Sequence, residues 1–133
     1  MINAESPIKE IMTREVYTLS PDDRLIKANL IFEEKGFHHL LVLENHELVG
    51  ILSKTDLLNF LWKSVGNENQ VKSSDLRIRE VMTPNPITID SDDTIGLAAD
   101  IFLSNKLHSL PVLDGDELVG VVTSYDLLKF SFS

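Results

Sequence analysis

The sequence predicts a mixed α/β (α+β) fold in which two β-α-β-β-α repeats pack with pseudo-twofold symmetry into one module. The chain aligns with itself at an offset of 70 positions, from residues 8–61 to residues 78–131, and about 22 of the 54 aligned pairs are identical, which indicates a duplication. In each copy the apolar residues change from the alternation typical of strands to the three- and four-residue steps typical of helices. We therefore expect an N-terminal tail over 1–7, a first repeat over 8–61, a linker over 62–77 and a second repeat over 78–131.

Each copy opens with a short helical lead-in, at 6–13 and 76–83, followed by a short strand, "YTLS" or "ITID". The acidic stretches that come next, at 20–23 and 90–93, are expected to supply the cap and the first-turn acids of a helix. Gly36 can adopt the left-handed conformation that ends the first of these helices. The apolar face of the two helices is formed by Leu25, Ala28, Ile31 and Phe32 in the first copy and by Ile95, Ala98, Ile101 and Phe102 in the second.

Two further strands follow in each copy, "LLVL" with "ELVGIL" and "LPVL" with "ELVGVV". Asp114-Gly115 is a good hairpin signal, and Glu44-Asn45-His46 is a weaker one. A second helix is expected to begin near Ser53 and near Thr123. The polar segment 63–77 that joins the copies is typical of a linker.

The composition is that of a globular domain, with 133 residues of which 43% are hydrophobic and 25% charged. The absence of cysteine excludes disulfides and thiolate metal sites and favours a reducing compartment. The first ten residues do not resemble a signal peptide, and no apolar run is long enough to span a membrane. We expect a soluble, cytoplasmic protein without membrane contact. The formal net charge of −9 argues against nucleic acid as a partner.

One phrase occurs in both copies, "ELVGILSKTDLL" at 47–58 and "ELVGVVTSYDLL" at 117–128. Its hydroxyl residue, Ser53 or Thr123, follows a strand and precedes an amphipathic helix, so it lies at the helix N-cap, with Asp56 or Asp126 at N3. One interpretation is a capping box with aspartate in place of glutamate. The other is a site for a nucleoside phosphate. A helix start with a hydroxyl favours the phosphate, and the carboxylate can accept hydrogen bonds from ribose hydroxyls.

The ordered series of motifs resembles the cystathionine-β-synthase-type (CBS) domain, which normally occurs as a tandem pair. The segments that carry the resemblance are "IMTREVYTLSPDDRL" and "FHHLLVLENHELVGILSKTDLL" in the first copy and "VMTPNPITIDSDDTI" and "LHSLPVLDGDELVGVVTSYDLL" in the second. The resemblance covers about nine tenths of the chain. It implies two units packed through their sheets, with a cleft that can hold AMP, ADP, ATP or S-adenosylmethionine. It also implies a stand-alone regulatory or sensor module that is not an enzyme, has no catalytic residues and carries no covalent cofactor.

The resemblance also assigns roles to residues. Asp56 and Asp126 would bind ribose, and the hydroxyls of Ser53 and Thr123 would bind a phosphate. The basic position before the second strand falls on His38 and His108. The family's adenine contacts correspond to Val16, Tyr17, Pro86 and Ile87.

The sequence departs from the family pattern at two positions, one of them in both copies and the other in the first copy only. Many members have arginine where this chain has His39 and Ser109, and the usual proline of the second strand, present as Pro111, is Leu41 in the first copy. Neutral histidine is a weaker phosphate ligand than arginine, so tight binding of a triphosphate is not expected.

Other features of the sequence suggest three alternatives to this function. A metal site at the histidines is disfavoured, because the adjacent side chains of His38 and His39 on a strand point to opposite faces. A hydrolase is disfavoured, because no Gly-x-Ser-x-Gly motif activates the hydroxyls. A structural or dimerisation module that regulates a partner protein explains the repeat without any ligand. The apolar helix ends "LLNFLW" and "LLKFSF" predict a homodimer.

Overall fold

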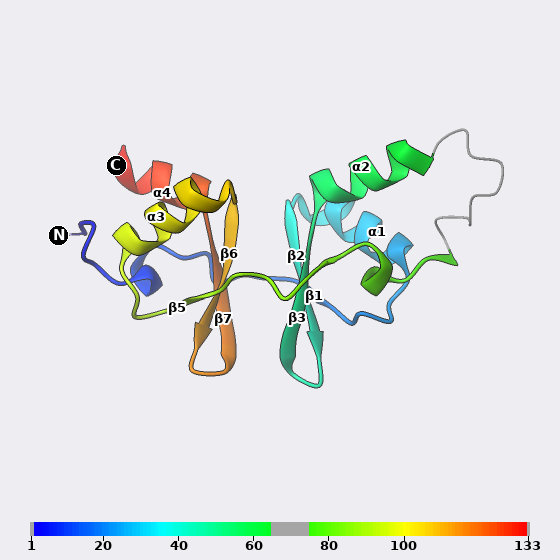
Figure 1. The fold of residues 1–133 in the computed structure, drawn as a ribbon, viewed down its shortest axis with the longest axis horizontal. Coiled ribbons are helices and arrows are strands. Elements are labelled where there is room, and N and C mark those ends of the chain that lie inside the picture. Colours follow the sequence, from blue (N-terminus) through cyan, green and yellow to red (C-terminus); the bar gives the residue numbers. More distant parts are fainter. Residues whose placement is uncertain (1, 65–74, 133) are drawn as a thin grey trace. The chain divides into compact units, whose positions relative to one another are not determined.

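The computed structural model describes residues 2–64 and 75–132 of the chain, and Figure 1 shows its fold. The predicted strand-helix-strand-strand-helix order is confirmed in both copies. In the first copy the elements are β1 (Thr18–Leu19), α1 (Leu25–Lys35), β2 (His39–Glu44), β3 (Glu47–Ser53) and α2 (Lys54–Ser64). In the second they are β5 (Ile89–Asp90), α3 (Ile95–Asn105), β6 (Ser109–Asp114), β7 (Glu117–Thr123) and α4 (Ser124–Ser131).

The chain divides into two compact units whose boundaries cross the sequence repeat. Unit 1 combines residues 1–16 with residues 87–133, and unit 2 is the continuous segment Tyr17–Pro86. Each repeat thus folds together with the lead-in that precedes the other repeat. Most of the predicted linker, residues 65–74, lies outside the described residues.

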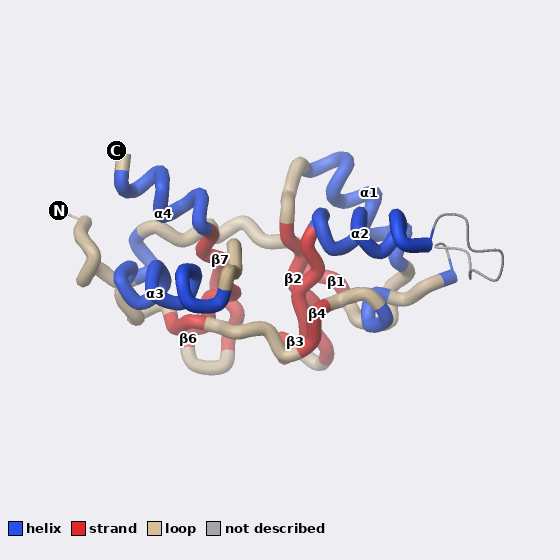
Figure 2. The backbone as a smooth tube through the Cα atoms, turned by 45° about the horizontal axis from the view of Figure 1, so that its top comes forward, coloured by secondary structure: helices blue, strands red, loops and turns tan. Residues whose placement is uncertain are grey.

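The sheet of unit 2 has the order β1-β2-β3-β4, where the short strand β4 (Thr83–Pro84) comes from the second lead-in. β1 is parallel to β2, whereas β2 with β3 and β3 with β4 are antiparallel. The sheet of unit 1 has three strands in the order β5-β6-β7, with β5 parallel to β6 and β6 antiparallel to β7. An isolated antiparallel bridge between Thr13 and Val121 stands in the place of β4. In each unit both helices lie on the same side of the hairpin (Figure 2), so that one face of the sheet is covered by helices.

The lead-ins supply core residues to the units they join. They form 3-10 helices at Ile8–Glu10 and Ile78–Glu80. Ile8 and Ile78 are completely buried, Ile8 in the core of unit 1 and Ile78 in the core of unit 2. Burial of such a side chain contributes about 2 kcal/mol, so each lead-in is an integral part of its unit. The predicted helix faces are also confirmed: Leu25, Ala28, Phe32, Ile95, Ala98 and Phe102 are buried, and Ile31 and Ile101 pack against the same cores.

The prediction that residues 20–23 and 90–93 cap the first helix of each repeat is wrong. Helix α1 begins at Leu25 after Arg24, which makes no side-chain cap, and α3 is capped by Thr94, whose hydroxyl accepts a hydrogen bond from the Leu97 N–H. The acidic stretches instead form tight turns. The Asp23 carboxylate accepts the Ser20 N–H at 2.8 Å, and the Asp93 carboxylate accepts the Asp90 N–H at 2.9 Å. The Asp23 and Asp93 carboxylates thus accept N–H groups of their own turns, which end before the helices begin at Leu25 and Ile95.

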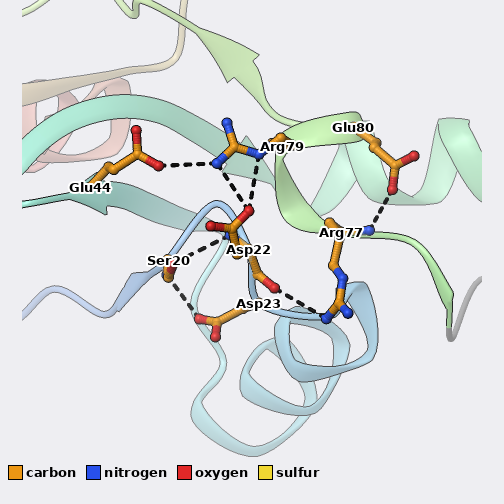
Figure 3. Close-up of polar contacts among 7 residues, drawn as sticks. All are labelled: Ser20, Asp22, Asp23, Glu44, Arg77, Arg79 and Glu80. Carbon is orange, nitrogen blue, oxygen red and sulfur yellow. Dashed lines mark hydrogen bonds and ion pairs between the residues drawn. The ribbon is translucent and has the colours of Figure 1, made fainter.

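A second acid of each turn, Asp22 or Asp92, anchors the lead-in. In unit 2 the Arg79 guanidinium contacts Asp22 and Glu44, both at 3.0 Å, and the Arg77 guanidinium donates to the Asp22 carbonyl (Figure 3). In unit 1 Lys9 pairs with Asp92 at 2.8 Å. The hydrogen bond and the charge of Asp92 raise the pKa of Lys9, and the hydrogen bonds to Asp22 and Glu44 raise the pKa of Arg79. The pairs are exposed, so they orient the lead-ins more than they stabilise them.

Both hairpins close through two-residue turns. In the first, Asn45 and His46 have φ values of 52° and 68°, and in the second Gly115 has a φ of 63°. The weaker of the two hairpin signals therefore also forms a tight turn. Gly36 adopts the predicted left-handed conformation after α1 with a φ of 69°. Within residues 2–64 and 75–132, no helix is long and apolar enough to cross a membrane.

Candidate ligand-binding site at the starts of helices α2 and α4

The start of α4 in unit 1 has a complete capping box. The Asp126 N–H donates to Thr123 Oγ1 at 3.1 Å, and the Thr123 N–H donates back to Asp126 Oδ2 at 3.0 Å. Thr123 and Asp126 are half-buried. The hydroxyl accepts through a lone pair, so its own proton stays available for a phosphate oxygen. The capping interpretation of the repeated phrase and the ligand interpretation are thus compatible at this helix.

The start of α2 in unit 2 has only half of this arrangement. The Asp56 N–H donates to Ser53 Oγ at 2.9 Å, which caps the helix. The Asp56 carboxylate, however, is exposed and accepts no hydrogen bond from any residue of the described segments. The two copies of the motif therefore differ: the Asp126 carboxylate is half-buried and accepts a backbone N–H, whereas the Asp56 carboxylate is exposed.

The two histidines lie beside these helix starts. The His38 carbonyl accepts the Lys54 N–H at 2.9 Å, and the His108 carbonyl accepts the Ser124 N–H at 2.9 Å. In both helices the donor is the first residue, so each histidine is tied by its backbone to the turn that carries the hydroxyl.

Sheet pairing brings further candidates to the same place. β1 and β2 run parallel, and His39 at the start of β2 pairs with Ser53 at the end of β3. The start of β1 is therefore at the same end of the sheet as the start of α2. Tyr17 precedes β1, its carbonyl accepts the Leu41 N–H, and its ring lies 5.0 Å from that of Phe37, next to His38. By the same register Ile87, just before β5, lies at the α4 end of unit 1.

The candidate residues thus fall into two groups. Tyr17, His38, Ser53 and Asp56 gather in unit 2, and Ile87, His108, Thr123 and Asp126 gather in unit 1. Val16 and Pro86 are the last residues before the chain passes from one unit to the other, and within the described residues no backbone hydrogen bond joins either of them to a helix start.

Thr13 was missed by the sequence-based assignment of the site. Its hydroxyl lies 3.2 Å from both carboxylate oxygens of Asp126, and its backbone exchanges two hydrogen bonds with Val121 of β7. The repeated Met-Thr pair, at 12–13 and 82–83, was the available signal. It did not show which strand the threonine would reach.

Other features of the surface do not coincide with these groups. A small apolar groove of about 90 Å³ between α1 and α2 is lined by Leu25, Ile26, Asn29, Leu57 and Leu61. Among the described residues no group of three or more histidines and acids could hold a metal ion.

A duplicated β-α-β-β-α fold, with a hydroxyl and a carboxylate at the start of the last helix of each repeat, defines a class of tandem-repeat modules. The family model of the CBS domain matches residues 8–63 and 78–133 of this chain. The chain belongs to the CBS domain family.

Among its relatives, the uncharacterized protein MJ1225 of Methanocaldococcus jannaschii is 29% identical over 137 residues, a match that covers 97% of this chain and 48% of that protein. The crystal structure of MJ1225, described as a proposed archaeal homologue of g-AMPK, has a TM-score of 0.83 and 28% identity over 99% of this chain and 49% of that one. The chain spans about half the length of MJ1225, and only 25% and 36% of the next two curated relatives, which are named as enzymes.

Two similar structures were solved with adenosine compounds. The CBS domain pair of protein MJ0100, in complex with 5′-methylthioadenosine and S-adenosyl-L-methionine, is 25% identical with a TM-score of 0.81, over 96% of both chains. CBSX2 in complex with AMP is also 25% identical, with a TM-score of 0.78 over 96% of both chains. Binding of adenosine compounds thus occurs in structures similar to this chain.

Proposed function

We propose that this chain is a regulatory sensor module that binds an adenosine-containing ligand at the starts of α2 and α4. The observation that carries the proposal is the pairing of a capping hydroxyl with a carboxylate at N3, which occurs at both helix starts. The adenosine complexes of the two similar structures support it.

The chemistry of each group suggests its role. A carboxylate can accept hydrogen bonds from ribose hydroxyls, and a helix start with a free hydroxyl proton favours a phosphate or another anion. Tyr17 and Ile87 offer an aromatic and an apolar surface for the adenine ring. Asp56 and Asp126 are the proposed ribose ligands, Ser53 and Thr123 the phosphate ligands, and Val16 and Pro86 join Tyr17 and Ile87 as proposed adenine contacts.

Charge limits the ligand. His39 and Ser109 stand where many members of the family have the arginine that a triphosphate would favour, and the chain carries a formal net charge of −9. Each additional phosphate raises the repulsion without adding a bidentate arginine contact. AMP or S-adenosylmethionine should therefore bind more tightly than ATP, with ADP between them.

Thermal shift measurements test this function. At 100 times its dissociation constant, a ligand of the folded state adds about 2.7 kcal/mol to the stability, a rise of several degrees in Tm. AMP, ADP, ATP, S-adenosylmethionine and NAD should be compared. Asp56→Asn and Asp126→Asn test the ribose ligands, and Asp100→Asn, an exposed acid on α3, is the charge-matched control. A Tm that no adenosine compound changes would refute the proposal.

A second candidate function, self-association without a ligand, is favoured by exposed apolar side chains on the helices. On α2, Leu58 and Trp62 are 58% and 79% exposed, and on α4, Leu128 and Phe132, which follows its last turn, are 56% and 85% exposed. We propose that a homodimer covers these side chains, since exposed apolar surface of this kind marks contact sites.

Light scattering of the intact protein over a range of concentrations tests the dimer. Trp62→Ser should shift the mass towards that of one chain, whereas Asn59→Ser, on the same helix, should not. A single-chain mass for the unmodified protein at all concentrations would exclude self-association, and the exposed helix faces would then be available to a regulated partner protein.

A further inference from the structure

The two carboxylates of the proposed ribose sites differ in what they already bind. Asp126 Oδ2 accepts the Thr123 N–H at 3.0 Å, and the Thr13 hydroxyl lies 3.2 Å from Oδ1 and 3.2 Å from Oδ2. A donor at equal distance from both oxygens straddles the carboxylate. The two neighbouring hydroxyls of a ribose need the same region in order to donate one hydrogen bond to each oxygen.

The carboxylate of Asp56 has no such competitor. Thr83 is the counterpart of Thr13 and has the same backbone register, because Thr83 pairs with Ile51 as Thr13 pairs with Val121. Thr83 is nevertheless exposed, whereas Thr13 is half-buried. Among the described residues no hydrogen bond joins the Thr83 hydroxyl to the Asp56 carboxylate. Within the described residues, Asp56 therefore keeps all four of its lone-pair positions for a ligand.

The position of Thr13 is maintained by its backbone. Its N–H donates to the Val121 carbonyl at 2.8 Å, and its carbonyl accepts the Val121 N–H at 2.9 Å. Met12, the preceding residue, is buried in the core of unit 1. Thr13 can release Asp126 by a rotation of its side chain, without movement of the backbone, so the contact is reversible.

We propose that the two sites are unequal, with Asp56 as the ribose acceptor and Thr13 as a positioning residue that keeps Asp126 occupied. This inference rests on the proposed function. The start of α2 then binds the ligand first. The start of α4 binds it only when the Thr13 hydroxyl gives up the carboxylate, at the cost of a hydrogen bond to a charged group.

Isothermal titration calorimetry of the full chain with AMP tests the inference. The unmodified protein should bind one AMP per chain, and Asp56→Asn should weaken this binding at least tenfold. Thr13→Val keeps the shape of the side chain but removes the hydroxyl, so it should strengthen binding at the second site about tenfold and raise the stoichiometry to two. Addition of Asp126→Asn to Thr13→Val should return the stoichiometry to one.

The controls separate competition from a structural effect. Thr13→Ser retains the donor and should behave as the unmodified protein, and Thr83→Val should leave the titration unchanged. Weaker binding in Thr13→Val with an unchanged Tm would show that Thr13 assists the site, which overturns the inference. Two equal sites in the unmodified protein would also overturn it, while the proposed function would stand. Absence of binding by AMP and by the other adenosine compounds in every variant would instead remove the proposed function itself.

Discussion

At the scale of single residues, Gly120 shows how closely the first lead-in approaches β7. A Cβ atom at this position would lie 2.7 Å from the Thr13 carbonyl oxygen and 3.0 Å from Met12 Sδ. The sulfur can move, but the carbonyl belongs to the backbone that pairs with Val121. Gly120→Ala must therefore displace the lead-in.

We expect Gly120→Ala to lower the free energy of unfolding by about 1–3 kcal/mol, the usual cost of an added methyl group in a packed site. Urea denaturation followed by circular dichroism measures the change. Ser104→Ala, on the exposed face of α3, is the control and should change the stability by less than about 0.5 kcal/mol. An unchanged midpoint for Gly120→Ala would mean that the lead-in does not approach the strand this closely.

The candidate site could be predicted at this scale as far as its chemistry depends on neighbours in sequence. The N-cap hydroxyls and the N3 aspartates follow from local helix rules, and both helices begin within one residue of the expected position. The contact of Thr13 with Asp126 joins residues 113 positions apart, so no local rule contains it. For the same reason, the motif alone did not distinguish Asp56 from Asp126.

At the scale of elements, the first hairpin has a turn of the correct length with a poorly suited residue. The turn Asn45-His46 places both residues at positive φ, as type I′ turns require, and Asn-Gly is the sequence that such turns prefer. His46, at a φ of 68°, carries a side chain in a conformation that glycine adopts without strain.

His46→Gly should therefore raise the free energy of unfolding, by about 0.5–1 kcal/mol, because relief of strain outweighs the added freedom of the unfolded chain. Thermal denaturation measures the gain. His46→Ala is the matched control, since it removes the imidazole but keeps the Cβ atom, and it should not stabilise the protein. Equal stabilisation by both variants would assign the effect to the imidazole rather than to the backbone.

The elements themselves were largely predictable, because their apolar periodicity repeats in both copies. The acidic turns were not, because the same residues suit a helix cap and a turn. The choice between these roles depends on partners far along the chain. Arg79 forms an ion pair with Asp22, and Lys9 forms one with Asp92. The partners are 57 and 83 positions apart, so no local pattern predicts the pairs.

At the scale of the whole molecule, the exchange of lead-ins makes the two units unequal. Unit 2 is one continuous segment, whereas unit 1 consists of two segments, with Tyr17–Pro86 inserted between them in the sequence. When unit 2 is folded, its ends leave from β1 and β4 at opposite edges of one four-stranded sheet, about 14 Å apart across three strand spacings. When unit 2 is unfolded, unit 1 must instead close a flexible loop of the same segment, at a cost of about 4 kcal/mol. Chain connectivity alone therefore makes unit 1 depend on unit 2.

The two repeats offer a matched pair of substitutions with which to measure this dependence. Val42 in unit 2 and Val112 in unit 1 occupy equivalent positions, and both side chains are completely buried. Replacement of either by alanine should lower the stability of its own unit by about 2 kcal/mol.

Val112→Ala should accelerate amide hydrogen exchange in β6 and β7 and leave β2 and β3 protected, because unit 2 does not need unit 1 to close its chain. Val42→Ala should accelerate exchange in all four strands, because each opening of unit 2 also removes the constraint on unit 1. If β6 and β7 exchange at wild-type rates in Val42→Ala, unit 1 stays folded without the constraint that unit 2 provides. If both variants accelerate exchange in all four strands, each unit depends on the other.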